Sequence, residues 1–310
     1  MAKEYSAISE SVPDALDGER IDRVVSFITG VSRSVVTQCI KDGEVRRNGI
    51  KVNKGSEKVT SGDQVVIDSA SIFESTEVKP DPEIQVPIVY EDEHFVVIDK
   101  PSGLVVHPAA SQKNRTMANG LLSLYPEIAT VGEPERPGIV HRLDKGTSGL
   151  LVAALSNESY LSLIRQLQDR TIERMYTALI IGSLEAEKGI IDAPLGRDPK
   201  NPIRRAVVSN GKDARTRYEE IERFQSTENY TLVKCELETG RTHQIRAHFS
   251  AIGHPIAGDS LYGASKTSNY LSRPFLHSSS LAFQHPISGE HLRFTSEIPE
   301  DLQKTLDMVQ

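Results

Sequence analysis

A short aperiodic stretch divides the 310-residue chain into two unequal parts. Residues 69–83 include the run EVKPDPE, which contains two prolines and follows neither helical nor strand periodicity. Such a stretch is typical of a linker between folded units. A chain of this length is also expected to form about two domains. We therefore predict a small domain over residues 19–68, a linker over 69–83 and a larger domain over 84–305.

The small N-terminal part has the pattern of two amphipathic helices followed by a hairpin. A first apolar stripe at helical spacing, ending at Gly30, consists of Ile21, Val24, Val25 and Ile28. Ser32 is a suitable N-cap for a second helix, which ends at Gly43. A turn at Asn48-Gly49 then joins two short β-type segments. A compact unit of two helices and a small sheet is the predicted result.

This order of elements resembles the S4 RNA-binding domain. The resemblance rests on the runs RIDRVVS, SRSVVTQCIKDGEVRRNG and VTSGDQVVI. It implies an RNA-binding module in which Arg33, Arg46 and Arg47 contact RNA. Charge alone favours another interpretation, in which these residues simply solvate the outer faces of two amphipathic helices. The order of helix, helix and basic hairpin favours RNA binding.

The larger part contains strand-like and helix-like segments in irregular order. The runs GLLVAALS, RMYTALIIG and YTLVKCELE have β-type composition, whereas THQIRAHFSAIG is helical in pattern. A further helix is predicted to begin with Asn157 as its cap. The absence of regular βα alternation favours an α+β fold with a mixed, mostly antiparallel sheet and flanking helices.

The charge of the chain does not by itself favour an RNA partner. The net charge is −7, whereas phosphate contacts come mostly from basic surfaces. The distribution is uneven, however, because residues 197–217 carry seven cations, Arg204 and Arg205 among them, against Asp198 and Asp213. This segment predicts a phosphate-contacting surface on a mildly acidic protein.

The segment HRLDKGTSGLLV places one carboxylate, Asp144, between the cations Arg142 and Lys145. A loop carboxylate beside a buried strand can be held rigidly and remain open to a ligand. Nearby cations would keep it ionised, as a nucleophile must be. By composition alone, an aspartate among cations is more often a surface ion pair. These residues leave both interpretations open.

HRLDKGTSGLLV resembles the signature of the pseudouridine synthases that modify ribosomal large-subunit RNA. The branch that combines an S4 domain with this core, the synthase D type, is the most similar. The resemblance extends through DKPSGLVVHP, RMYTALIIG, LGRDPKNPIRRAV, TGRTHQIRAH, GHPIAGDSLYG and RPFLHSSSLAF, in that order. It implies a catalytic domain with a central active-site cleft and large-subunit ribosomal RNA as the partner.

The resemblance also implies roles for individual residues. Asp144 corresponds to the catalytic aspartate, Tyr176 to the tyrosine that packs on the target base, and Arg246 to the arginine that pairs with the aspartate. Ile245 would line the same pocket, while Arg142 and His141 would contact the RNA. Pseudouridine formation moves the uracil from N1 to C5 without a redox change, so we expect neither a cofactor nor a metal.

Several alternatives stay open at this point. The aspartate could attack ribose C1′, add to C6 of the base or act through a glycal-like intermediate, and the target uridines are not specified. A ribosome-assembly factor that binds RNA without modifying it is a second hypothesis, although Asp144, Tyr176 and Arg246 are all retained. A glycosidase would need a second positioned carboxylate, which the matched motifs lack.

Other features restrict location and metal binding. The chain has no run of roughly 18 apolar residues, so no membrane span is expected. Its N-terminus lacks an apolar signal core, which favours the cytoplasm. His243 and His248 are five residues apart and do not match the spacing of a zinc-binding helix. We expect a monomer.

Overall fold

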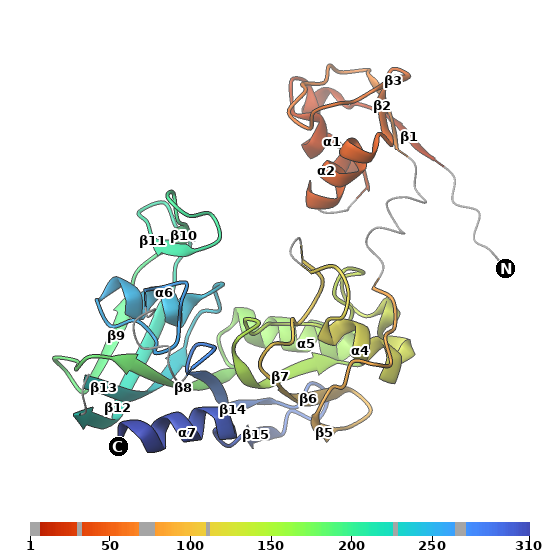
Figure 1. Cartoon of the computed structure of the whole chain (residues 1–310). Helices are drawn as coiled ribbons and strands as arrows, with labels where there is room; N and C mark the ends of the chain where they lie inside the picture. Colours follow the sequence, from red (N-terminus) through yellow and green to blue (C-terminus); the bar gives the residue numbers. More distant parts are fainter. Residues whose placement is uncertain (1–6, 30–32, 68–77, 110–111, 226–228, 264–270) are drawn as a thin grey trace. The chain divides into compact units, whose positions relative to one another are not determined.

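The computed structural model describes residues 7–29, 33–67, 78–109, 112–225, 229–263 and 271–310. The chain divides into two compact units, Met1–Glu77 and Val78–Gln310. No described helix has the length and apolar character needed to cross a membrane. Figure 1 shows the elements of both units, and each unit is described by itself.

The N-terminal unit is a small antiparallel sheet combined with two helices. Its elements are β1 (Ile8–Ser11), the 3-10 helix η1 (Asp14–Leu16), α1 (Ile21–Thr29), α2 (Arg33–Asp42), β2 (Val45–Arg47), β3 (Ile50–Lys51) and β4 (Gln64–Ile67). The strand order is β1-β4-β2-β3. Ile21, Val24 and Val25 are fully buried, which confirms the stripe predicted for the first helix. The predicted helix end Gly30 and N-cap Ser32 lie outside the described residues.

This unit begins earlier in the chain than residue 19. Strand β1 pairs with β4, with Ile8 opposite Ile67, and Val12 is buried in the core. Without β1, strand β4 would be an unpaired edge of the sheet. The segment before residue 19, which is polar in composition, therefore supplies the strand that covers this edge. Residues 69–77 of the predicted linker, and residue 68 before it, lie outside the described residues.

The end of the predicted linker packs on the C-terminal unit. Val78 is buried, and the backbone amide of Asp81 donates to the carbonyl oxygen of Asn119. The Asn119 side chain in turn donates to the carbonyl oxygen of Lys79 at 2.7 Å. Residues 78–83 therefore belong to the larger unit, held there by the buried Val78 and by partly buried hydrogen bonds that the sequence pattern does not reveal.

The C-terminal unit is built around a nine-stranded mixed sheet, in the order β5-β6-β7-β14-β8-β13-β12-β9, with β15 also paired to β14. Its elements are β5 (Ile88–Glu91), β6 (Phe95–Lys100), α4 (Met117–Leu124), η2 (Pro126–Thr130), β7 (Ser148–Ala154), α5 (Asn157–Gln168), β8 (Glu173–Ile181), β9 (Lys188–Asp192), β10 (Leu195–Arg197), β11 (Arg205–Val207), β12 (Arg215–Gln225), β13 (Asn229–Leu237), α6 (Gln244–Ala251), β14 (Leu276–Gln284), β15 (His291–Thr295) and α7 (Glu300–Val309). Only β7 and β14 pair in parallel among the described strands. The predicted α+β class with a mostly antiparallel sheet is confirmed.

Helix α5 shows a local difference from the prediction. Its N-cap is Ser156 rather than Asn157, and the Ser156 hydroxyl accepts a hydrogen bond from the amide of Ser159. Serine and asparagine are comparable N-caps, and Ser156 and Asn157 are adjacent, so the sequence did not determine at which of the two the helix begins.

The centre of the sheet determines where the HRLD loop lies. Strand β7 is buried along its whole length and runs beside β14, which separates it from β8. A Cβ atom at Gly149 would lie 2.2 Å from the carbonyl oxygen of Ser278, so only glycine permits this close approach of β7 to β14. The loop before β7 is thereby placed opposite β8 and the segment that leads from β13 into α6.

Candidate active site

Asp144 lies in the loop that immediately precedes β7, and buried contacts hold this loop in place. The Lys145 carbonyl oxygen accepts a hydrogen bond from the Gly103 amide at 2.7 Å. Beneath it, the fully buried Lys100 ammonium donates to the carbonyl oxygens of Pro101 and Leu104 at 2.8 and 2.9 Å. Burial lowers the pKa of Lys100 to about 7, although the charge of Asp144 opposes this shift. The loop is thus a rigid support for the Asp144 carboxylate.

Arg246 links this carboxylate to a second, deeper one. Its Nη1 donates to Asp144 Oδ2 at 2.9 Å, while its Nε and Nη2 donate to the two oxygens of Asp259 at 2.6 and 2.9 Å. Asp259 is fully buried, and the Asp144 side chain is 15% exposed. Burial lowers the pKa of Arg246, but the hydrogen bonds and charges of the two carboxylates outweigh it and raise this pKa above its usual value. A fixed guanidinium therefore orients Asp144, which keeps access to solvent.

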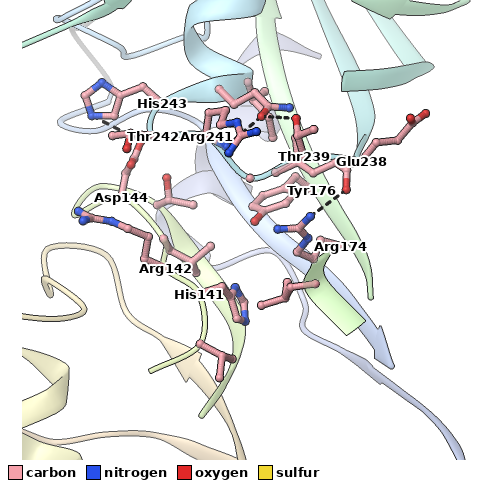
Figure 2. A pocket seen from close by; sticks show the side chains of 18 of the residues that line it. His141, Arg142, Asp144, Arg174, Tyr176, Glu238, Thr239, Arg241, Thr242 and His243 are labelled. Atoms are coloured by element: carbon pink, nitrogen blue, oxygen red, sulfur yellow. Dashed lines mark hydrogen bonds and ion pairs between the residues drawn. The ribbon is translucent and has the colours of Figure 1, made fainter. Parts of the chain in front are cut away.

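A cavity of about 540 Å³ opens beside Asp144. Its wall includes Tyr176, which is 5% exposed and shares one face of β8 with Arg174, two residues earlier. Burial raises the pKa of Tyr176, so the phenol stays protonated. Ile245 is buried in the same wall. Figure 2 shows the Asp144 carboxylate and the Tyr176 ring facing the same space.

His243 closes the cavity on the side of α6. It is the N-cap of α6 and adopts a left-handed backbone conformation, with φ of 56°. Its Nε2 lies 3.8 Å from Asp144 Oδ2, and its Nδ1 lies 3.1 Å from the Tyr262 hydroxyl. Burial lowers the pKa of His243, which favours a neutral ring. Among the described residues, Asp144 therefore has one cationic partner in contact, Arg246.

His141 connects the HRLD loop to the strand that follows. The Val152 amide donates to His141 Nε2 at 3.1 Å, so the neutral ring carries its hydrogen on Nδ1. Burial, followed by the charge of Arg174, lowers the pKa of His141 to about 3. The ring lines the cavity as an uncharged hydrogen-bonding group.

We expect the half-buried His141 to make the protein sensitive to acid. An unfolded chain protonates this histidine below about pH 6.5, whereas the folded chain does so only near pH 3, so stability is lost as pH falls through that window. A His141→Gln variant should therefore lose less stability than wild type, by roughly 1 kcal/mol per pH unit between about pH 6 and 4. Urea unfolding at pH 7, 6, 5 and 4 measures this difference. Parallel pH profiles would contradict it.

Arg142 points away from the loop into the open part of the site. The residue is exposed, and its Nη1 lies 3.3 Å from His107 Nε2. Burial, followed by the charge of Arg142, lowers the pKa of His107 to about 4. A neutral His107 can accept a hydrogen bond from the guanidinium and so hold Arg142 in position.

The predicted basic segment forms a hairpin beside the site. Arg205 lies on β11, and its backbone amide donates to the Tyr262 hydroxyl at 2.8 Å. The guanidinium of Arg204 lies 4.9 Å from the centre of the Tyr262 ring, and that of Arg246 lies 5.1 Å from it. Tyr262 thus joins the β10–β11 hairpin to the Asp144–Arg246 pair. Two further predicted cations are neutralised locally, because Arg215 and Arg217 both pair with Glu238.

The three predicted RNA contacts of the N-terminal unit differ in their surroundings. Arg33 pairs with the buried Asp22 at 3.0 Å. Arg47 pairs with Asp63 at 2.6 Å. Arg46 is exposed on β2, and its side chain has no ion-pair partner among the described residues of this unit. Of these three arginines, Arg46 is the one without an ion pair in the described part of the unit.

Four residues of the site escaped the analysis of the sequence. Asp259 and Tyr262 lie within GHPIAGDSLYG, Lys100 within DKPSGLVVHP and Arg174 within RMYTALIIG, all strings that were matched as wholes. A charged residue at the end of an apolar run is a signal that could have singled out Lys100 and Arg174, whereas no local signal marks Asp259 or Tyr262. Among the described residues, no three His, Cys, Asp or Glu side chains are grouped so that they could hold a metal ion.

The geometry can now be compared with known proteins. Residues 94–251 match the RNA pseudouridylate synthase family, and residues 19–65 match the S4 domain. The chain is 42% identical over 290 residues to the uncharacterized RNA pseudouridine synthase YlyB of Bacillus subtilis, covering 93% of each chain. It is 41% identical over 311 residues to ribosomal large subunit pseudouridine synthase D of Pseudomonas aeruginosa, covering 96% of this chain and 94% of that one.

This chain belongs to the RNA pseudouridine synthase family. It is therefore an isomerase that acts on RNA, as the resemblance of its motifs predicted, and its N-terminal unit contains an S4 domain. The solved structure of human RNA pseudouridylate synthase domain containing 1 has the same fold, with a TM-score of 0.57 and 23% identity over 74% of this chain and 97% of that one. The RNA pseudouridine synthase family match includes the HRLD loop, β8 and α6, which surround the cavity.

Proposed function

We propose that this pseudouridine synthase modifies uridines of large-subunit ribosomal RNA. The relatives from Pseudomonas aeruginosa and Nitrosomonas europaea, 41% and 40% identical, carry the name ribosomal large subunit pseudouridine synthase D. The S4 match adds an RNA-binding module to the catalytic unit. The structure of the RNA around each target, rather than a base sequence alone, would then select the uridine.

Asp144 is the proposed nucleophile. The observation that carries this role is the contact of Asp144 with Arg246, whose other face is held by the buried Asp259. A charge-assisted pair of this kind keeps a carboxylate ionised and fixes its direction. The carboxylate can attack C1′, add to C6, or remove a proton on the way to a glycal. The isomerisation is balanced within the substrate, so the proposed reaction uses neither cofactor nor metal.

The proposed substrate is a uridine flipped out of its stack. Flipping costs on the order of a few kcal/mol, and stacking on an aromatic ring returns roughly 1–3 kcal/mol. Tyr176 and Ile245 lie in the cavity wall where a base would be received. The exposed Arg142, held by His107, is suited to occupy the position that the base leaves.

Further RNA contacts are proposed on both units. In the C-terminal unit, Arg204 and Arg205 lie beside the cavity on the hairpin side of Tyr262. In the N-terminal unit, Arg46 would contact phosphate directly, whereas Arg33 and Arg47 would exchange or share their carboxylate partners. We infer a monomer that acts in the cytoplasm on the ribosomal RNA.

Mapping the product tests this proposal. Purified protein is incubated with unmodified large-subunit and small-subunit ribosomal RNA, and pseudouridines are located by chemical modification and primer extension. We expect new pseudouridines at a few defined positions of the large-subunit RNA and none in the small-subunit RNA. Product confined to transfer RNA or to small-subunit RNA would contradict the proposed substrate, while leaving the family activity intact.

A further inference from the structure

One charged group in the cavity wall has no evident role in orienting Asp144. Arg174 is 6% exposed, lies on β8 two residues before Tyr176 and faces the same cavity. Its charge influences Tyr176 on one side and His141 on the other. Figure 2 shows its guanidinium next to the phenol ring, across the cavity from Asp144.

The guanidinium of Arg174 is poorly compensated by the protein. It donates one weak hydrogen bond, from Nη2 to the Leu237 carbonyl oxygen at 3.3 Å, and its buried Nε has no partner among the described residues. No carboxylate within the described residues pairs with it. Two nearby carboxylates have other partners: Glu173, the preceding residue, pairs with Arg293, and Glu238, which lines the same cavity, pairs with Arg215 and Arg217.

The surroundings of Arg174 are shaped to keep the guanidinium in place. A Cβ atom at Gly240 would lie 2.6 Å from Arg174 Nη1, so any other residue there would displace the group. Burial lowers the pKa of Arg174, as expected for a cation whose one hydrogen bond among the described residues is the long contact with Leu237. Burying a cation whose N–H donors lack acceptors costs free energy, unless a bound ligand supplies those acceptors.

We propose that Arg174 donates hydrogen bonds to a carbonyl oxygen of the target uracil and stabilises the negative charge that the base acquires during the reaction. This inference rests on the proposed function, because it takes the cavity next to Asp144 as the place of the flipped uridine. A guanidinium has donors and no acceptor, so it complements a carbonyl and not an amino group.

The charge arises in each route open to Asp144. When the C1′–N1 bond breaks, by direct attack or through a glycal, the electron pair remains with N1 and is shared by O2 and O4. Addition of the carboxylate to C6 pushes the electron pair of the C5–C6 bond onto O4 in the same way. The charge disappears when C5 bonds to C1′ and loses its proton, while N1 gains one. A preformed donor at the carbonyl therefore lowers the barrier in all three routes.

The test combines a protein change with a change of one atom in the RNA. Arg174→Met is assayed in single turnover on an RNA that wild type modifies, synthesised with uridine, 2-thiouridine or 4-thiouridine at the target position. We expect Arg174→Met to slow the reaction of the uridine RNA by about 10²-fold, with RNA affinity unchanged. Sulfur is the weaker acceptor, so one of the two thio substitutions should cost wild type more than it costs the variant.

This coupling distinguishes contact from a structural role. The proposal would be overturned if each thio substitution slowed wild type and Arg174→Met by the same factor. It would also be overturned if Arg174→Met reacted with the uridine RNA within about threefold of the wild-type rate. Arg293→Met is the matched control, since Arg293 is exposed on β15, pairs with Glu173 at the surface and does not line the cavity. An equal loss in this control would also overturn the proposal. If Arg174→Met does not fold, Arg174→Lys retains the charge and enters the same cycle. Full activity of an Asp144→Asn variant would contradict the proposed function separately from Arg174.

Discussion

Replacing Asp144 with Asn is expected to abolish pseudouridine formation, with a loss of at least about 10⁴-fold in the single-turnover rate. The amide keeps the size of the side chain and can still accept a hydrogen bond from Arg246 Nη1, which now lies 2.9 Å from Asp144 Oδ2. It is not a nucleophile and does not act as a base. The variant should therefore bind the RNA as wild type does and leave its uridines unchanged. Product is measured by mapping, and affinity by filter binding.

Asp213→Asn is the matched control for this variant. Asp213 is exposed, and its contact with Arg241 runs through the backbone carbonyl oxygen, which the substitution keeps. We expect it to react at the wild-type rate. Retained turnover by Asp144→Asn would exclude this aspartate as the reactive group, and a parallel loss of RNA affinity would show that the substitution disturbs binding instead.

Replacing Asp259 with Asn is expected to impair both stability and activity. Asp259 is fully buried and binds Arg246 through both carboxylate oxygens. Removing its charge leaves a buried guanidinium with Asp144 as its remaining carboxylate, and breaking such a pair costs about 3 kcal/mol or more. Arg246 would then shift toward Asp144, and a misplacement of about 1 Å can cost on the order of 10²-fold in rate. Urea unfolding and single-turnover assays measure the two effects.

Glu173→Gln serves as the control for charge removal. Glu173 lies on β8 and pairs with Arg293 at 2.5 Å, with both side chains nearly half exposed. Surface pairs of this kind contribute at most about 1 kcal/mol, so this variant should behave as wild type. Comparable losses of stability and rate in the two variants would mean that the buried Asp259–Arg246 pair contributes no more than a surface pair. Unchanged activity of Asp259→Asn would show that Asp144 needs no fixed partner.

Local patterns were sufficient for the secondary structure and the class of fold. The stripe of Ile21, Val24 and Val25 predicted α1, and the β-type composition of GLLVAALS predicted β7. Such patterns depend on neighbours along the chain, which the sequence displays directly. Segments whose partners are distant were misjudged: Ile8–Ser11 reads as a polar lead-in until β4 is placed beside it.

The residues of the site also fall into those that local motifs mark and those that only the folded chain brings together. The HRLD motif marked Asp144, and the family resemblance marked Tyr176 and Arg246, because both depend on short ordered strings. Arg246 meets Asp144 across 102 positions of the chain, and that distance is closed by the pairing of β7, β14 and β8. Asp259 was not singled out, because nothing local marks a carboxylate that will be buried under an arginine.

The sequence by itself determined the class of fold, the family and the position along the chain of Asp144, the proposed reactive carboxylate. Only the tertiary structure decided what surrounds that carboxylate. Packing turned Asp144 from one more charged residue among cations into the solvent-accessible end of an Asp–Arg–Asp chain, and it left Arg174, in the opposite wall, without an ion-pair partner among the described residues. The physical reason is that desolvation depends on the packing of distant segments, and it gives a charge its energetic weight.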